Sequence, residues 1–422
     1  MKKNGLLNKN NKELVKRITF TIFMLFLIRL LTKIPVPFLN STIASLTYAD
    51  QDALGLYNRL TGGGIEEFSI FSLSISPYIT ASILVQLLSI LFPSLETLQK
   101  DGEYGKKKIE KITRKVNLIL SFIQAFLITA AFSYSRVIYR GSLPLLIVTL
   151  VLVAGSLVLM WMGSKITKYG VGNGISLILL LNVLSRIPKD IESIYGQFIE
   201  DKGSIGILYG IAAISIALLI AVLTIYLNEA IRKIPIQYSK KMSGKFDDSA
   251  HIPLKLNVGN VMPIIFASSI LALPSLFALG MQDASKAGVM QFILKASQQN
   301  KWFNLGSWEY SIGYIVYVGL MLFFSYFYAE MAFNPTEIAY SLKRSGGSIP
   351  NVRSGSETET YLKSLSDRLI LLGALYLLFI CSIPIILTGI LQVKATLLGT
   401  SIIIIVSIFM ETYKQINVNR LK

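Results

Sequence analysis

Apolar and polar residues alternate in long blocks along this chain. Runs of mostly apolar residues are separated by polar segments rich in Lys and Arg. An α-helix needs about 20 residues to cross the roughly 30 Å hydrocarbon core of a membrane. The pattern predicts an all-α polytopic membrane protein with ten transmembrane helices, at residues 18–34, 54–92, 116–134, 143–162, 175–187, 205–227, 261–279, 312–328, 369–387 and 395–410.

The second apolar segment, residues 54–92, is interrupted near its start. Gly62, Gly63 and Gly64 weaken the helix there and leave a short leading piece, about residues 54–60, free to bend as a unit. Lipid offers no partner to the N–H and C=O groups of irregular backbone. Such backbone therefore survives at membrane depth only where protein covers it or where it lines a cavity. We interpret this segment as the wall and stopper of an internal passage.

Composition supports a membrane protein and excludes cysteine chemistry. Of the 422 residues, 53% are hydrophobic and only 15% are charged. The single cysteine, Cys381, lies inside an apolar run, so neither a disulfide framework nor a Cys-based metal site is possible. The single histidine, His251, falls in a predicted loop, where a solvated side chain is expected.

The formal net charge of +17 is distributed unevenly over the predicted loops. Well over half of the 41 Lys and Arg residues lie on the side of the membrane that holds the N-terminus, and ten spans place the C-terminus on that side too. Cytoplasmic loops carry the excess of basic residues in membrane proteins. The chain is therefore expected to have a cytoplasmic N-terminal segment, a cytoplasmic tail and two large cytoplasmic loops, at residues 1–17, 414–422, about 228–258 and about 330–368.

An internal repeat is predicted from the number of spans. Cutting the chain at the polar stretch 189–204, an expected external hinge, leaves five spans in each half, residues 18–188 and 205–413. An odd number of spans per half gives the halves opposite topology. The paired second and seventh spans both contain P-x-I-x-A-S, at residues 77–82 and 263–268. Two inverted pseudo-symmetric five-helix halves around a central pore explain this echo, and two unrelated proline kinks are the alternative.

The predicted spans carry little of the chemistry that a coupled transporter or an enzyme needs. Spans two to four and six to ten hold no carboxylate in mid-membrane, and Arg29 and Arg186 are the strongly charged residues within or at the edge of apolar runs. Neither a G-x-x-x-x-G-K-[ST] nor an H-E-x-x-H motif occurs. Residues 170–174 form a glycine-rich segment that follows no predicted strand and is interpreted as a tight turn. We expect no catalysis, cofactor, metal or small-molecule substrate, and a passage that suits polypeptide.

Several longer segments carry a resemblance to a known family. They include IPVPFLN (34–40), FSIFSLSISPYITASILVQLL (68–88), LMWMGSKITKYGVGNGISLI (159–178), HIPLKLNVGNVMPIIFASSI (251–270) and FNPTEIAYSLKRSGGSIPNVRSG (333–355). With these segments in the order in which the family has them, the chain resembles the SecY/Sec61-alpha family of protein-conducting channels over nearly its whole length. The resemblance implies a channel in the bacterial cytoplasmic membrane. Such a channel passes unfolded secretory polypeptides and releases membrane helices laterally.

The resemblance also implies the roles of particular residues. It places an aliphatic pore ring at Ile75, Ile79, Ile175, Leu179, Ile265 and Ile404, and a plug at about 54–64 that includes Gly55, Leu56, Leu60, Gly62, Gly63 and Gly64. It places a lateral gate, between spans two and three and spans seven and eight, at Thr80, Gln86, Gln124, Ser268 and Ser269, and cytoplasmic partner contacts at Arg232, Lys233 and Arg353. Ordinary helix packing remains the alternative for each ring and gate residue.

The partners implied by the resemblance are SecE and SecG subunits, the SecA ATPase, the ribosome, signal peptides, nascent polypeptides and membrane lipids. One departure from the family pattern is Ser164, which stands where an acidic residue is usual. Departures of this kind leave open a specialised paralogue beside a housekeeping channel. Two rival functions also remain open: a secondary transporter, and a scaffold or insertase without a through-pore.

Overall fold

The computed structural model describes residues 2–40, 68–134, 136–139, 141–196, 201–238, 251–280, 288–297, 302–303, 308–391 and 400–421. Ten helices in this part of the chain correspond to the ten predicted spans. They are α1 (Lys2–Leu31), α4 (Ser76–Leu91), α6 (Gly102–Tyr134), α7 (Ser142–Tyr169), α8 (Gly174–Tyr195), α9 (Asp201–Glu229), α10 (Met262–Gly280), α12 (Trp308–Ala332), α14 (Ser356–Leu391) and α15 (Ser401–Leu421).

Length and hydropathy support membrane crossing. In the described residues, six stretches are long and apolar enough to span a membrane. They fall in α6, α7, α9, α14, α15 and the stretch Tyr310–Ser345, which begins in α12. Helices α4 and α10 are shorter and also apolar. Large apolar side chains face outward on these helices, as on α9, where Ile211, Ile214 and Leu218 are exposed. Apolar surface of this kind is stable against lipid, so the chain is an all-α, multi-span membrane protein.

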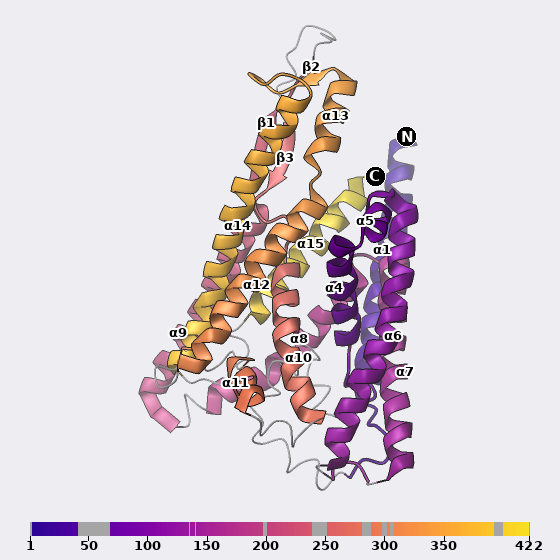
Figure 1. Ribbon diagram of the computed structural model, residues 1–422, viewed down its shortest axis with the longest axis vertical. Coiled ribbons are helices and arrows are strands. Elements are labelled where there is room, and N and C mark those ends of the chain that lie inside the picture. Colours follow the sequence, from indigo (N-terminus) through magenta and orange to yellow (C-terminus); the bar gives the residue numbers. More distant parts are fainter. Residues whose placement is uncertain are drawn as a thin grey trace.

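The helices form two groups that follow the order of the chain. Helices α1, α4, α6, α7 and α8 pack among themselves, as do α9, α10, α12, α14 and α15. The groups meet where α4 and α6 contact α10, and again where α1 and α8 contact α15. In Figure 1 the indigo and purple helices of the first group lie beside the orange and yellow helices of the second, and both chain ends point to the same end of the molecule.

Helix ends differ from the predicted spans at several places. Helix α1 begins at Lys2, well before the apolar run, and α8 continues through Pro188 to Tyr195. Helix α9 begins at Asp201, so most of the polar stretch 189–204 is helical. The hydrophobic pattern marks only the part of a helix that lies in lipid. Polar residues continue a helix beyond the membrane without changing its backbone hydrogen bonding.

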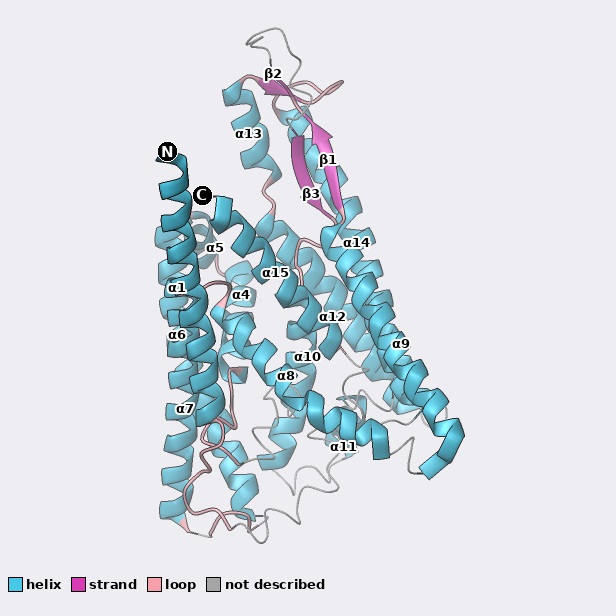
Figure 2. Cartoon of the chain, turned by 180° about the vertical axis from the view of Figure 1, so that it is seen from behind, coloured by secondary structure: helices cyan, strands magenta, loops and turns pink. Residues whose placement is uncertain are grey.

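The described parts of the two large predicted loops, residues 230–238, 251–258 and 330–368, contain strands and helices. Strand β1 (Ile231–Pro235) pairs antiparallel with β3 (His251–Lys255), and β2 (Gln237–Tyr238) pairs with β4 (Gly347–Ser348). Helix α13 (Pro335–Ser345) starts with Asn334 capping the N–H of Glu337 and ends at the left-handed Gly346. We call these strands, α13 and the start of α14 the polar-end module; Figure 2 shows it beyond the helix bundle.

Two further short helices complete the described structure, and apolar side chains fill the bundle. They are α5 (Pro93–Lys100), which leads into α6, and α11 (Gly288–Ser297), which packs on α10 and α12. One apolar cluster joins both helix groups, and the fully buried Cys381 belongs to it. A second cluster lies mainly within the first group, around Phe68, Ile128 and Leu152. A third holds the polar-end module together.

Candidate functional site

The six predicted ring residues lie in one apolar cluster at the junction of the two helix groups. Ile79 lies on α4, and Ile75 directly precedes this helix; Ile175 and Leu179 lie on α8, Ile265 on α10 and Ile404 on α15. Five of the side chains are buried, with exposed fractions from 1% to 7%, and Ile175 is half-buried against the same cluster. Four segments that are far apart in sequence therefore contribute these residues to one continuous apolar core.

The chain reaches the first ring residue through a tightly held turn, residues 68–75. The N–H of Val36 donates to the carbonyl of Phe68 at 2.8 Å, and the N–H of Ile70 donates to the carbonyl of Ile34 at 3.0 Å. These bonds tie the turn to the segment that follows α1. The predicted plug residues before this turn, Gly55, Leu56, Leu60, Gly62, Gly63 and Gly64, lie outside the described residues.

The predicted lateral gate coincides with the contact of α4 and α6 with α10. Gln124, Ser268 and Ser269 are buried there, with exposed fractions of 4% to 5%. In the described part of the chain, Gln124 Oε1 and Ser269 Oγ have no hydrogen-bond partner. The hydroxyl of Thr80 donates to the carbonyl of Ser76 in its own helix at 3.0 Å.

A direct hydrogen bond joins the two helix groups at this contact. The hydroxyl of Tyr328 on α12 donates to Gln86 Oε1 on α4 at 2.7 Å, and Gln86 Nε2 donates to Ser82 Oγ at 3.2 Å. The ring of Tyr328 also packs edge-on against Phe266 of α10. The family resemblance named Gln86 as a gate residue, and the sequence did not single out Tyr328, which is one of several aromatic residues in an apolar run.

A polar network beneath the polar-end module was also not predicted. Asn228 Nδ2 donates to Ser407 Oγ at 2.9 Å, and Asn257 Nδ2 donates to Asn228 Oδ1 at 3.0 Å. Lys414 Nζ donates to the carbonyl of Asn228 at 2.9 Å. These bonds tie α9 to α15 beside a cavity of about 400 Å³ that Lys255 and Glu411 also line.

The predicted partner contacts lie on the polar-end module. Arg232 and Lys233 are exposed on β1, opposite Leu254 and Pro253 of β3. The side chain of Arg353 is 89% exposed, and its Nη1 lies 3.9 Å from Glu357 Oε1. An exposed ion pair at this distance holds the guanidinium only weakly. All three basic groups are therefore open to a partner.

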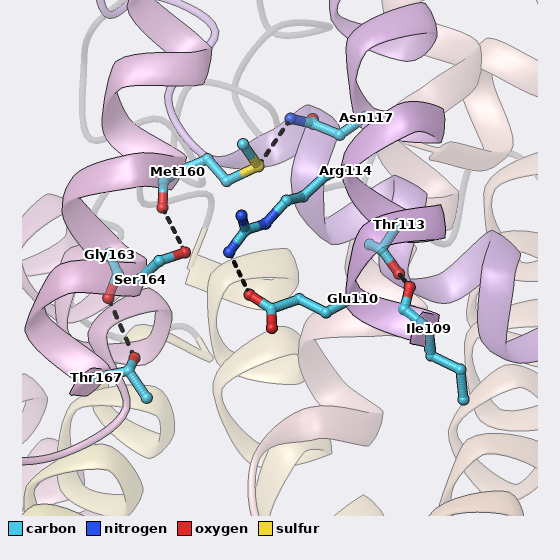
Figure 3. A network of polar contacts seen from close by, with 9 residues as sticks. All are labelled: Ile109, Glu110, Thr113, Arg114, Asn117, Met160, Gly163, Ser164 and Thr167. Atoms are coloured by element: carbon cyan, nitrogen blue, oxygen red, sulfur yellow. Dashed lines mark hydrogen bonds and ion pairs between the residues drawn. The ribbon is translucent and has the colours of Figure 1, made fainter. Parts of the chain in front are cut away.

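Serine at position 164 is accommodated locally between α6 and α7. Ser164 Oγ donates to the carbonyl of Met160, and Asn117 Nδ2 donates to Met160 Sδ at 3.3 Å across the helix pair. Arg114 forms its ion pair at 2.6 Å with Glu110 of its own helix. Figure 3 shows this ion pair on the side of α6 that faces α7. Arg114 on α6 thus has a carboxylate partner in its own helix, although position 164 on α7 holds serine in place of the usual acidic residue.

Comparisons with known proteins agree with this architecture. The family model SecY matches residues 69–413. The protein translocase subunit SecY of Rickettsia typhi is 37% identical, over 97% of this chain and 94% of that protein. Its counterpart in Staphylococcus epidermidis is 35% identical, over 96% and 94%.

Solved structures share the fold. A structure described as a protein conducting channel aligns with a TM-score of 0.67 at 18% identity, over 97% of this chain and 93% of that chain. Sec61 from a canine ribosome-channel complex aligns with a TM-score of 0.63 at 19% identity, over the same shares. The fold and the full-length sequence identity point to one family of non-enzymatic subunits. This chain belongs to the SecY family of protein translocase subunits.

Proposed function

We propose that the chain forms the pore of a protein-conducting channel in the bacterial cytoplasmic membrane. It passes unfolded secretory polypeptides across the membrane and releases membrane helices sideways into lipid. Two halves, residues 18–188 and 205–413, flank the pore. Both termini and the polar-end module face the cytoplasm, because basic residues concentrate at that end.

The observation that supports this proposal is that six aliphatic side chains from both halves belong to one apolar cluster. Residues 75, 79, 175, 179, 265 and 404 all belong to one apolar cluster and contain no group that binds an ion. A narrow apolar neck excludes water and ions because wetting it is unfavourable. Aliphatic side chains have no preferred polar partner, so the ring yields to polypeptides of mixed sequence.

The remaining parts of the channel follow from this ring. The glycine-broken segment at about residues 54–64 acts as a plug of the pore. The contact of α4 and α6 with α10 and α12 acts as the lateral gate, which a signal peptide opens by breaking weak polar contacts such as the one between Gln86 and Tyr328.

The partners are cytoplasmic and membrane-embedded proteins. SecE and SecG complete the translocase, while SecA or the ribosome delivers the polypeptide to the polar-end module. Arg232, Lys233 and Arg353 supply exposed basic contacts there, in keeping with the charge that a ribosome or an acidic protein surface requires.

The first experiment measures ion conductance of the purified translocase in planar bilayers. We expect the wild type to be sealed and a deletion of residues 55–64 to conduct ions, because the plug no longer supports the ring. A deletion of equal length in the polar loop 239–248 is the control and should stay sealed. Tight bilayers with the plug deletion would contradict a plugged pore and favour an insertase without a through-pore.

A further inference from the structure

Helix α8 carries a polar residue on the face that bears its two ring residues. Ile175, Leu179 and Asn182 are spaced i, i+4 and i+7, so they share one side of the helix. Asn182 Nδ2 donates to Ser74 Oγ at 2.7 Å, and the exposed fractions of the two residues are 6% and 2%. The bond therefore lies one helical turn from Leu179, and Ser74 directly precedes Ile75.

Ser74 lies near the end of the turn 68–75, directly before the ring residue Ile75. Its φ is +51°, in the left-handed region, and its N–H donates to the carbonyl of Phe71 at 2.7 Å. Helix α4 starts just after it, and Ile75 at the helix start has no side-chain cap. The Asn182 amide is thus a polar side-chain contact that connects this helix start to α8.

We propose that Asn182 is a positioning residue that fixes the α4 part of the pore ring against the α8 part. The inference rests on the proposed ring. An amide or hydroxyl buried away from water is strongly disfavoured without a partner, so Asn182 and Ser74 hold each other in one arrangement. That arrangement sets the relative height of Ile75 and Leu179 and keeps the closed ring tight.

Conductance of the purified translocase tests this role through variants that break and restore the bond. Asn182→Leu removes the amide at similar volume. Ser74→Gly removes the hydroxyl while keeping a left-handed backbone favourable. The exchange variant, Asn182→Ser with Ser74→Asn, rebuilds the pair, since asparagine tolerates positive φ. Asn117→Leu, on α6 beside Met160, is the matched control for loss of a buried amide.

We expect each single variant to open spontaneously roughly three to ten times more often than the wild type, as loss of one intramembrane hydrogen bond implies. The exchange variant and Asn117→Leu should stay near the wild-type level. Closed single variants would overturn the proposal, as would an exchange variant that leaks as much as the single ones.

An Ile79→Asn variant in the same experiment separates the two levels of the argument. If Ile79→Asn channels leak while Asn182→Leu and Ser74→Gly channels stay tight, the hypothesis of an aliphatic ring is supported and the positioning role of Asn182 is refuted. A tight Ile79→Asn channel would refute the ring, and the positioning role would fall with it.

Discussion

At the scale of single residues, the Tyr328–Gln86 hydrogen bond is the contact whose loss is simplest to interpret. Tyr328→Phe removes the hydroxyl and keeps the ring that packs on Phe266. One intramembrane hydrogen bond contributes about 0.6–2 kcal/mol, so the closed gate should weaken by that amount. We expect export of a reporter with a defective signal sequence to rise several-fold in cells that carry this variant.

A second tyrosine on α12 provides the control for this substitution. The hydroxyl of Tyr314 lies 2.6 Å from Ser382 Oγ of α14, within the second half of the chain. Tyr314→Phe should leave the discrimination between signals unchanged, whereas Gln86→Leu should act in the same direction as Tyr328→Phe. Equal stringency in Gln86→Leu, Tyr328→Phe and wild-type cells would count against a gating role for this bond.

The exposed Arg353 is expected to affect partner binding and not folding. Its side chain is 89% exposed with one distant carboxylate, so Arg353→Glu removes little internal stability. An arginine fork bonds a carboxylate or phosphate in two places, and a charge reversal replaces this attraction with repulsion. We expect binding of SecA or ribosomes to vesicles that contain the translocase to fall about tenfold or more.

The control for Arg353→Glu is Lys189→Glu, an equal change of charge at an exposed position of α8, within the stretch 189–204 that is predicted to be external. This variant should bind both partners nearly as well as the wild type. If Arg353→Glu binds SecA and ribosomes as well as the wild type does, Arg353 does not contribute to the binding of either partner.

At the scale of elements, the fit of α7 against the turn 68–75 depends on one glycine. A Cβ at Gly155 would overlap the carbonyl of Ile70, which is backbone and has little freedom to shift. Gly155→Ala should therefore lower the free energy of unfolding by about 1–3 kcal/mol, as overpacking does. Thermal unfolding of the purified protein in detergent measures this effect.

Gly319 on α12 offers the matched substitution, because a Cβ there would meet open space. Gly319→Ala should leave stability unchanged or raise it slightly, since alanine favours helix. If Gly155→Ala unfolds at the wild-type temperature, then α7 does not hold the turn at this point.

The helices were predictable from the sequence and the strands were not, because the helices lie in lipid and the strands lie outside it. Lipid requires every backbone group to bond within its own helix, so long apolar runs predict helices reliably. Strands β1 and β3 lie outside the membrane, and each contains a proline, at positions 235 and 253. Proline argues against a central strand but fits an edge, and both strands of a two-stranded ribbon are edges.

At the scale of the whole molecule, the sequence predicted which face of a helix points inward but not which residues meet across helices. The spacing of Ile175 with Leu179 placed both on one side of α8, and the structure packs both against the same cluster. The contacts of Tyr328 with Gln86 and of Asn182 with Ser74 depend on how helices distant in sequence cross and at what height they meet. No local pattern carries that information, so these two residues were found only in three dimensions.

The burial of Cys381 makes the protein inert toward thiol reagents. This residue is the only cysteine in the chain, and its exposed fraction is 0% in the core that joins the two halves. A cysteine introduced on the surface would therefore be the one thiol that a maleimide can reach. A label on a single introduced surface cysteine would therefore report on one chosen site, without any change to the native thiol.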